Sequence, residues 1–392
     1  MKIRWLGTWL LLAAAAGAVE FSGQVGTEGR LFLADPLDGR QHGNNISLYA
    51  QVELYRDWDD GAQRLALTPF VRWDQGDEER SHVDLRELYW RKSFARADLY
   101  VGLRKVFWGV TESLHLVDIV NQTDLVENFD GEDKLGQPMV QFTWLPDWGT
   151  VDLFLLPYFR ERPFAGVEGR LRPGLVIDAD AAVYEADGEE WNPDVALRWS
   201  HYMGPFDIGL AHFYGTGREP RMVPRFDSEQ AVLVPHYDLL HQSSLDLQYT
   251  REGWLGKLEA VHRDGVEGRS QAFVAGLEYT LVGVFGTVID WGLVGEYLYD
   301  NREAPFAPVG DGDIALGGRW VFNDIQDTNL LAFVSIDAAD GSRFASVEAK
   351  RRLGGNGEIR IEGRFLTNVD SDNILAGLRR DDYVQVELVR YF

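Results

Sequence analysis

The chain contains no cysteine, no long hydrophobic run and few basic residues. Without cysteine it cannot be a disulfide scaffold, a zinc ribbon, an iron–sulfur protein or a thiol enzyme. No apolar run reaches the ~18 residues that a membrane-spanning helix needs, which excludes a helical membrane protein. Lysine and arginine number 38 against 62 aspartates and glutamates, a formal charge of −24 over 392 residues. This acidic chain has no basic footprint for nucleic acid. A soluble multidomain enzyme and a β-barrel in a membrane remain open.

The first eighteen residues have the pattern of a secretory signal peptide. Lys2 and Arg4 give a positive start, and an apolar stretch follows from Trp5 to Ala18. The tripeptide at 16–18 (AGA) places small residues at both positions of a cleavage site. We therefore expect residues 1–18 to be removed on export. The remaining residues, 19–392, would carry a formal charge of −26.

Apolar residues alternate with polar ones through most of the remaining chain. Residues 358–365 (EIRIEGRF) and 46–55 (ISLYAQVELY) are clear examples. A period of two indicates a β-strand with two different faces. Charged residues occur in the middle of these segments, and aromatic residues such as Trp73, Trp199, Trp320 and Phe392 lie near their ends. Segments of about 10 residues that are apolar outside, polar inside and bordered by aromatic girdles are typical of a transmembrane β-barrel.

Eighteen such segments can be counted along the chain. They are 21–33, 45–57, 63–74, 81–93, 97–107, 137–145, 150–160, 193–202, 206–214, 239–250, 254–263, 270–281, 289–300, 312–322, 328–336, 343–352, 356–366 and 383–392. Short turns alternate with long connections at 34–44, 108–136, 161–192, 215–238 and 367–382. Long extracellular loops, short periplasmic turns and an even strand number characterise bacterial barrels. The expected fold is therefore all-β, an antiparallel up-and-down transmembrane barrel of about 18 strands. Sixteen is the alternative, because 175–185 can be a hairpin within a loop and the strand near 239 is weakly marked.

The last residues resemble the C-terminal signal of bacterial outer-membrane proteins. The chain ends VQVELVRYF, with Phe392 last and Val384, Val386 and Leu388 on one face. Arg390 departs from the pattern, in which an apolar or aromatic residue is usual, although an arginine near an interface can snorkel. The resemblance implies that the barrel-assembly machinery reads Phe392.

The connection 108–136 is the third extracellular loop in this count, and it is acidic. Its carboxylates are Glu112, Asp118, Asp124, Glu127, Asp130, Glu132 and Asp133, against the single Lys134. Residues 113–120 (SLHLVDIV) allow a short helix with Ser113 as its cap. The apolar residues of the loop suggest that it packs on a wall. A solvated acidic loop is the alternative.

Basic residues fall on the polar, lumen-facing positions of the expected strands. They are Arg72, Arg86, Arg104, Arg198, Arg319, Arg360 and Arg364, with Lys350 and Arg352. An acidic loop that faces an arginine ladder would set up a transverse field across a constriction. Because a guanidinium recognises carboxylate and phosphate, small polar, zwitterionic or anionic solutes would be favoured. The alternative is that these arginines pair with lumen glutamates such as Glu348 and Glu362.

The segment 105–125 (KVFWGVTESLHLVDIVNQTDL) resembles a loop motif in a group of uncharacterised proteobacterial outer-membrane barrels. The architecture as a whole resembles the porin-like class. In general porins and in eighteen-stranded substrate-specific porins the third loop folds inward as the constriction, so the resemblance implies that role for 108–136.

The function expected is passive diffusion of small polar or charged solutes through the outer membrane of a Gram-negative bacterium. A barrel of 16–18 strands keeps a water-filled lumen. A barrel that serves a partner, as an export channel or sheath, is the alternative. An enzyme is not expected, because none of the eight histidines lies in a recognisable catalytic motif. We expect no cofactor and no metal site. Expected partners are lipid, lipopolysaccharide and the transported solute, and an oligomer of identical chains is open.

Overall fold

The computed structural model describes residues 19–226, 231–302, 312–338, 340–369 and 374–392. The expected signal peptide, residues 1–18, lies outside the described residues. Within the described ranges no helix is both long and apolar enough to span a membrane.

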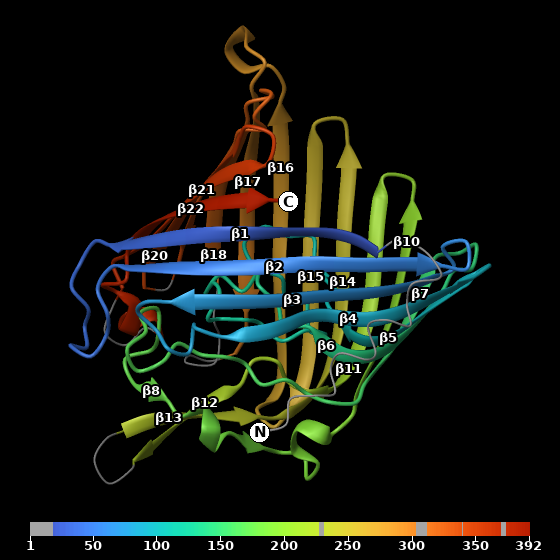
Figure 1. Ribbon diagram of the computed structural model, residues 1–392, viewed down its shortest axis with the longest axis horizontal. Helices are drawn as coiled ribbons and strands as arrows, with labels where there is room; N and C mark the ends of the chain where they lie inside the picture. Colours follow the sequence, from blue (N-terminus) through green and yellow to red (C-terminus); the bar gives the residue numbers. More distant parts are fainter. Residues whose placement is uncertain (1–18, 227–230, 303–311, 339, 370–373) are drawn as a thin grey trace.

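Eighteen antiparallel strands form one closed sheet, in which each strand pairs with the next and the last pairs with the first (Figure 1). The strands are β1 (Val19–Phe32), β2 (Asn45–Trp58), β3 (Gln63–Asp74), β4 (Val83–Phe94), β5 (Ala97–Arg104), β6 (Gln137–Trp144), β7 (Thr150–Leu156), β10 (Asp194–Met203), β11 (Phe206–Thr216), β14 (Leu239–Arg251), β15 (Trp254–Gly265), β16 (Gly268–Leu281), β17 (Asp290–Asp300), β18 (Asp313–Val321), β19 (Asn329–Ile336), β20 (Arg343–Leu353), β21 (Gly357–Thr367) and β22 (Tyr383–Tyr391). The expected fold class and the count of eighteen are confirmed, and sixteen is wrong.

The alternation in sequence becomes an outer and an inner face. On β2, Ile46 and Leu48 are 52% and 50% exposed, whereas Ser47 and Tyr49, which alternate with them, are buried. Successive strand residues point to opposite sides of a sheet, so the outer side of the barrel wall is mostly apolar. Exposed aromatic residues lie toward both ends of the strands. At the short-turn end they are Phe21, Phe94, Trp144, Trp148, Tyr202, Phe206, Trp254 and Phe392, and Trp73, Tyr214 and Tyr297 lie nearer the long-loop end. This distribution is typical of a barrel surrounded by lipid.

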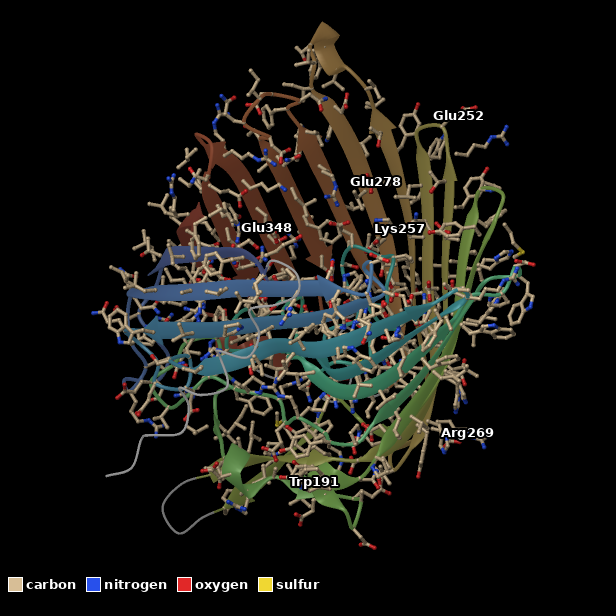
Figure 2. The ribbon with its side chains drawn as sticks, turned by 45° about the vertical axis from the view of Figure 1, so that its right-hand side comes forward. Trp191, Glu252, Lys257, Arg269, Glu278 and Glu348 are labelled. Carbon is tan, nitrogen blue, oxygen red and sulfur yellow. The ribbon has the colours of Figure 1, made fainter. Side chains whose placement is uncertain are left out.

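Short and long connections lie at opposite ends of the barrel. Figure 2 shows Glu252 in the turn between β14 and β15 at one end, and Trp191 at the other end beside a small extra sheet. Both β1 and β22 have their terminal residues at the short-turn end, where Gln24 pairs with Tyr391. The alternation has exceptions. At the long-loop end β15 and β16 are joined only by residues 266–267 and β19 and β20 by 337–342, whereas at the short-turn end β16 and β17 are joined by the longer connection 282–289.

The small sheet belongs to the two longest connections that follow the third loop. It consists of β8 (Val176–Ile177), β9 (Val183–Tyr184), β12 (Arg221–Phe226) and β13 (Ala231–Tyr237). Both β8 and β9 pair in parallel with β13 and not with each other, so a hairpin at 175–185 is wrong. The described residues contain no α-helix, only the short 3-10 turns η1 (Ala179–Ala181), η2 (Glu189–Trp191), η3 (Val284–Gly286) and η4 (Ile374–Leu378).

Candidate constriction site

The connection between β5 and β6, residues 105–136, is packed inside the barrel, and we call it the inner loop. Val117 and Val120 are fully buried, and Trp108 is 5% exposed. They join a hydrophobic cluster with Phe154 of β7 and Phe213 of β11, and the cluster extends along the wall through Met139, Leu156, Ala196, Ala211, Val261, Ala272, Val274, Leu298 and Ala315. The apolar residues of the loop therefore pack on the wall, as expected. The expected helix at 113–120 does not form.

A wall glutamate, Glu259 of β15, binds the backbone of the inner loop. Its Oε1 accepts hydrogen bonds from the N–H groups of Val110 (2.7 Å) and Thr111 (3.1 Å) and from the Thr111 hydroxyl (2.8 Å). Its Oε2 accepts a bond from the Val117 N–H at 3.1 Å. Glu259 is fully buried, so these donors replace its water. The sequence does not indicate this contact, because Glu259 and the loop residues that it binds are far apart in the chain.

A second wall glutamate, Glu296 of β17, also binds backbone N–H groups of the inner loop, at the next two residues. It accepts the N–H groups of Glu112 (2.7 Å) and Ser113 (2.8 Å), and the Ser113 hydroxyl at 2.5 Å. The predicted cap Ser113 thus binds a wall carboxylate instead of starting a helix. The Glu112 side chain lies 2.7 Å from Arg319 and 3.5 Å from Lys257.

Lys257 belongs to β15 and lies 3.7 Å from Glu278 of the neighbouring β16, so both side chains point into the barrel (Figure 2).

Two of the predicted loop carboxylates are fully buried and paired. Asp118 lies 3.3 Å from Lys134 within the same loop. Asp124 lies 2.5 Å from Arg86 of β4. Burial raises the pKa of Asp118, although Lys134 lowers it in part.

Two more carboxylates of the inner loop, Glu127 and Asp130, bind arginines on two different strands of the wall. Glu127 accepts two hydrogen bonds from Arg72 of β3, at 2.9 and 2.7 Å. Asp130 lies 3.0 Å from Arg364 of β21. The inner loop is therefore held by β3 and β4, by β15 and β17, and by β21.

Every arginine of the predicted ladder has a partner. Arg72, Arg86, Arg319 and Arg364 pair with the inner loop. Three others bind wall groups: Arg104 to Gln141, Arg198 to Asp246, and Arg360 to Glu358 and Glu387. Arg352 and Lys350 lie 3.9 and 4.0 Å from Asp327, in the turn between β18 and β19. The acidic loop and the arginines thus meet in direct ion pairs. They do not face each other across an open gap, because the loop packs against the wall that carries the arginines.

A neighbouring cluster of buried charged residues was not predicted from the sequence. Arg80, which precedes β4, lies 2.7 Å from Asp74 and 2.9 Å from Glu28 of β1, and its Nε donates to the Val126 carbonyl at 2.7 Å. Arg30 of β1 donates to the Glu127 carbonyl at 3.3 Å. The inward positions of Glu28 and Arg30 in an alternating strand were the available signal.

The last turn of the inner loop keeps carboxylates in contact with water. The Glu132 side chain is 55% exposed and lies 3.0 Å from His115. Burial alone would lower the pKa of His115, but its contacts with Glu132 and Glu259 raise it to about 10. Asp133 is exposed to the lumen, yet protein surrounds it on most sides, and desolvation together with Glu127 and Asp130 raises its pKa to about 7.

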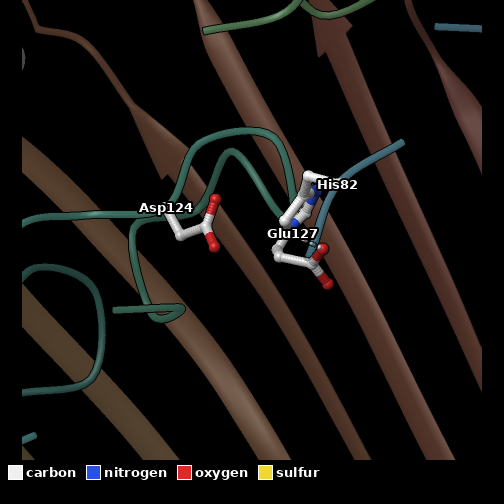
Figure 3. Close-up of side chains that lie close together, drawn as sticks. All are labelled: His82, Asp124 and Glu127. Carbon is white, nitrogen blue, oxygen red and sulfur yellow. Dashed lines mark ion pairs between the residues drawn. The ribbon is translucent and has the colours of Figure 1, made fainter. Parts of the chain in front are cut away.

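One group of three side chains has the residue types of a metal site. His82, just before β4, lies beside Asp124 and Glu127 of the inner loop, and one ligand atom from each falls within 4.8 Å of the others (Figure 3). Arg86 and Arg72 already bind these carboxylates. Spacing in the sequence does not indicate the group, because two strands, β4 and β5, separate His82 from the inner loop.

The connection from β7 to β10, residues 157–193, crosses the long-loop end of the barrel. Arg170 pairs with Asp381 at 2.7 Å with both side chains 1% exposed, and Arg172 pairs with Asp38 at 2.8 Å. Below this crossing lies a cavity of about 470 Å³, whose lining includes His82, Asp124 and Arg160–Val167. Its lining combines residues of the inner loop with residues of this connection.

A closed eighteen-stranded antiparallel barrel with an apolar outer face and a loop packed inside has the porin fold. The chain is similar in structure to Salmonella typhi OmpF solved with daunomycin, with a TM-score of 0.52 and 9% identity over 96% of this chain and 98% of that chain. OmpT of Vibrio cholerae lacking loop L8 gives a TM-score of 0.47 at 11% identity, over 96% and 100% of the chains. A porin mutant from Rh. blastica gives a TM-score of 0.45 at 11% identity with the same coverage. No family model and no curated protein matches the chain.

Proposed function

We propose that the chain forms a passive diffusion pore for small polar or charged solutes, and that the inner loop sets what passes. The observation that carries the proposal is a closed barrel of eighteen strands with a charged inner face and a loop anchored within it. A barrel of this size is too wide for its own side chains to fill. Passage is then controlled by whatever narrows the lumen.

The proposed pore favours cations over anions. Most of the predicted ladder is neutralised, because Arg72, Arg86, Arg198, Arg319, Arg360 and Arg364 each pair with a carboxylate. Arg104 binds the neutral amide of Gln141 and keeps its positive charge. Glu132 and Asp133 remain in contact with water at the last turn of the inner loop. Because charge next to a narrow aqueous path raises the local concentration of counter-ions, these carboxylates attract cations.

The proposal places the barrel in the bacterial outer membrane. The apolar outer face and the aromatic residues at the short-turn end support contact with lipid. A closed sheet satisfies every backbone amide of the spanning strands without water. Lipopolysaccharide at the long-loop end, and assembly of identical chains, belong to the same proposal.

Planar-bilayer recording of the refolded protein under a salt gradient tests the function. The proposal predicts a steady conductance with a reversal potential of cation-selective sign. Deletion of residues 112–133 should raise the conductance, because it removes most of the inner loop. A barrel that is folded, as judged by heat-modifiable migration on a gel, and yet never conducts would contradict the pore and favour a barrel that serves a partner.

A further inference from the structure

His82 is oriented so that one ring nitrogen faces two carboxylates. Its Nδ1 lies 2.9 Å from the Arg80 carbonyl. A carbonyl only accepts, so Nδ1 carries the proton and donates, and the neutral ring has its lone pair on Nε2. This nitrogen is buried and has no hydrogen-bond partner among the described residues, and Glu127 Oε1 lies 3.5 Å from it.

Asp124 also presents an unpartnered atom to this point. The residue is fully buried, and its Oδ2 lies 2.5 Å from Arg86. Its Oδ1 has no hydrogen-bond partner within the described part of the chain. A buried acceptor without a donor costs about 1–3 kcal/mol, and more when it is charged. Asp124 and His82 therefore leave two unsatisfied acceptors beside Glu127.

We propose that His82, Asp124 and Glu127 bind one divalent transition-metal ion of the zinc class. The ligand atoms are His82 Nε2 and one carboxylate oxygen from each acidic residue, which lie within 4.8 Å of one another. Imidazole and carboxylate are ordinary zinc ligands, and a backbone carbonyl on the other ring nitrogen is the usual support for a metal-binding histidine. The cavity of about 470 Å³, lined by His82 and Asp124, provides an approach for the ion.

The surrounding arginines set the strength of this site. Arg86 and Arg72 bind the same carboxylates, so the ion adds positive charge beside two guanidinium groups. Arg86 binds Oδ2 of Asp124 and leaves Oδ1 available, whereas Arg72 contacts both oxygens of Glu127 and must share one of them. We therefore expect weaker binding than in a structural zinc site. The bound ion would tie the inner loop to the connection before β4.

The outer surface contains a competing pair of histidines that the test must remove. His212 Nε2 and His241 Nδ1 lie 3.5 Å apart on β11 and β14, both residues exposed. The parent for the test is therefore the double variant H212A/H241A of the full, refolded barrel. Zinc binding is measured by titration calorimetry and by equilibrium dialysis, neither of which needs an open channel.

The expected result is one zinc ion per barrel in the parent, and binding at least about 10-fold weaker in the same background with H82A. D124N, which keeps the shape of the side chain and an acceptor for Arg86, should weaken binding too, and it replaces H82A if that variant fails to refold. H236A, in β13 of the small sheet, is the matched control and should leave binding unchanged. Cobalt and nickel should compete with zinc, as their ligand preferences imply.

Three results would overturn the proposal. The first is zinc binding that H82A and D124N leave unaltered. The second is binding that disappears already in the H212A/H241A parent. The third is an unmodified, refolded protein that binds no zinc, which would mean that a proton on Nε2 satisfies the group. None of these depends on conductance, so a failed pore and a failed metal site are separate outcomes.

Discussion

Removing the carboxylate of Glu259 should loosen the inner loop without breaking the barrel. In E259A the N–H groups of Val110, Thr111 and Val117 lose their acceptor. A hydrogen bond to a charged group contributes about 1.5–3 kcal/mol. A loss of about 2 kcal/mol for a given amide makes its opening about 30-fold more frequent, since each 1.4 kcal/mol is a factor of ten. The apolar contacts of Val117 stay in place, so the loop should remain inside.

Hydrogen exchange measured by mass spectrometry is the assay. Peptides that cover residues 108–118 should exchange about 30-fold faster in E259A than in the unmodified protein, while peptides from the strands should not change. E278A is the matched control, because Glu278 lies on the adjacent strand and contacts Lys257 but accepts no inner-loop amide among the described residues. Exchange in E259A within about threefold of the unmodified protein would show that packing alone holds the loop.

Two further predictions concern charge. The pKa of Asp133 lies near 7, so its negative charge is present above that pH and is lost as the pH falls through it. The cation-to-anion permeability ratio should therefore drop between pH 8 and 6, and D133N should remove most of that change; a ratio independent of pH in both proteins would refute the assignment. In R170A the buried Asp381 loses its partner, which typically costs about 3–5 kcal/mol. Limited proteolysis should then cut within 157–193 faster than in R269A, a change at the exposed pair of Arg269 and Asp264. Equal rates would contradict the anchoring of this connection by Arg170.

The strands could be predicted because their signal is local. Alternation within ten or so residues decides which side chains face lipid, and all eighteen segments form strands. The expected strands 97–107 and 150–160 stop earlier, at Arg104 and Leu156, because the chain leaves the wall there. The small sheet was missed because β8 and β9 have two residues each and form only against β13.

The candidate site was predictable in its location but not in its contacts. The excess of carboxylates and apolar residues in 108–136 marks a loop that packs on a wall, and the lumen arginines follow from alternation. Which carboxylate meets which arginine depends on the closed barrel. In the sequence, Glu259 and Glu296 look like ordinary lumen residues. Glu259 accepts the Val117 N–H, which in a helix at 113–120 would bond to the Ser113 carbonyl.

The anchoring of the inner loop also constrains the order in which the chain can fold. The loop is made early, at residues 105–136, but it contacts Glu259, Glu296 and Arg364, the last more than 200 residues later. It cannot reach its final position until β21 has entered the sheet. Complete docking of the loop is therefore a late event that accompanies closure of β1 against β22.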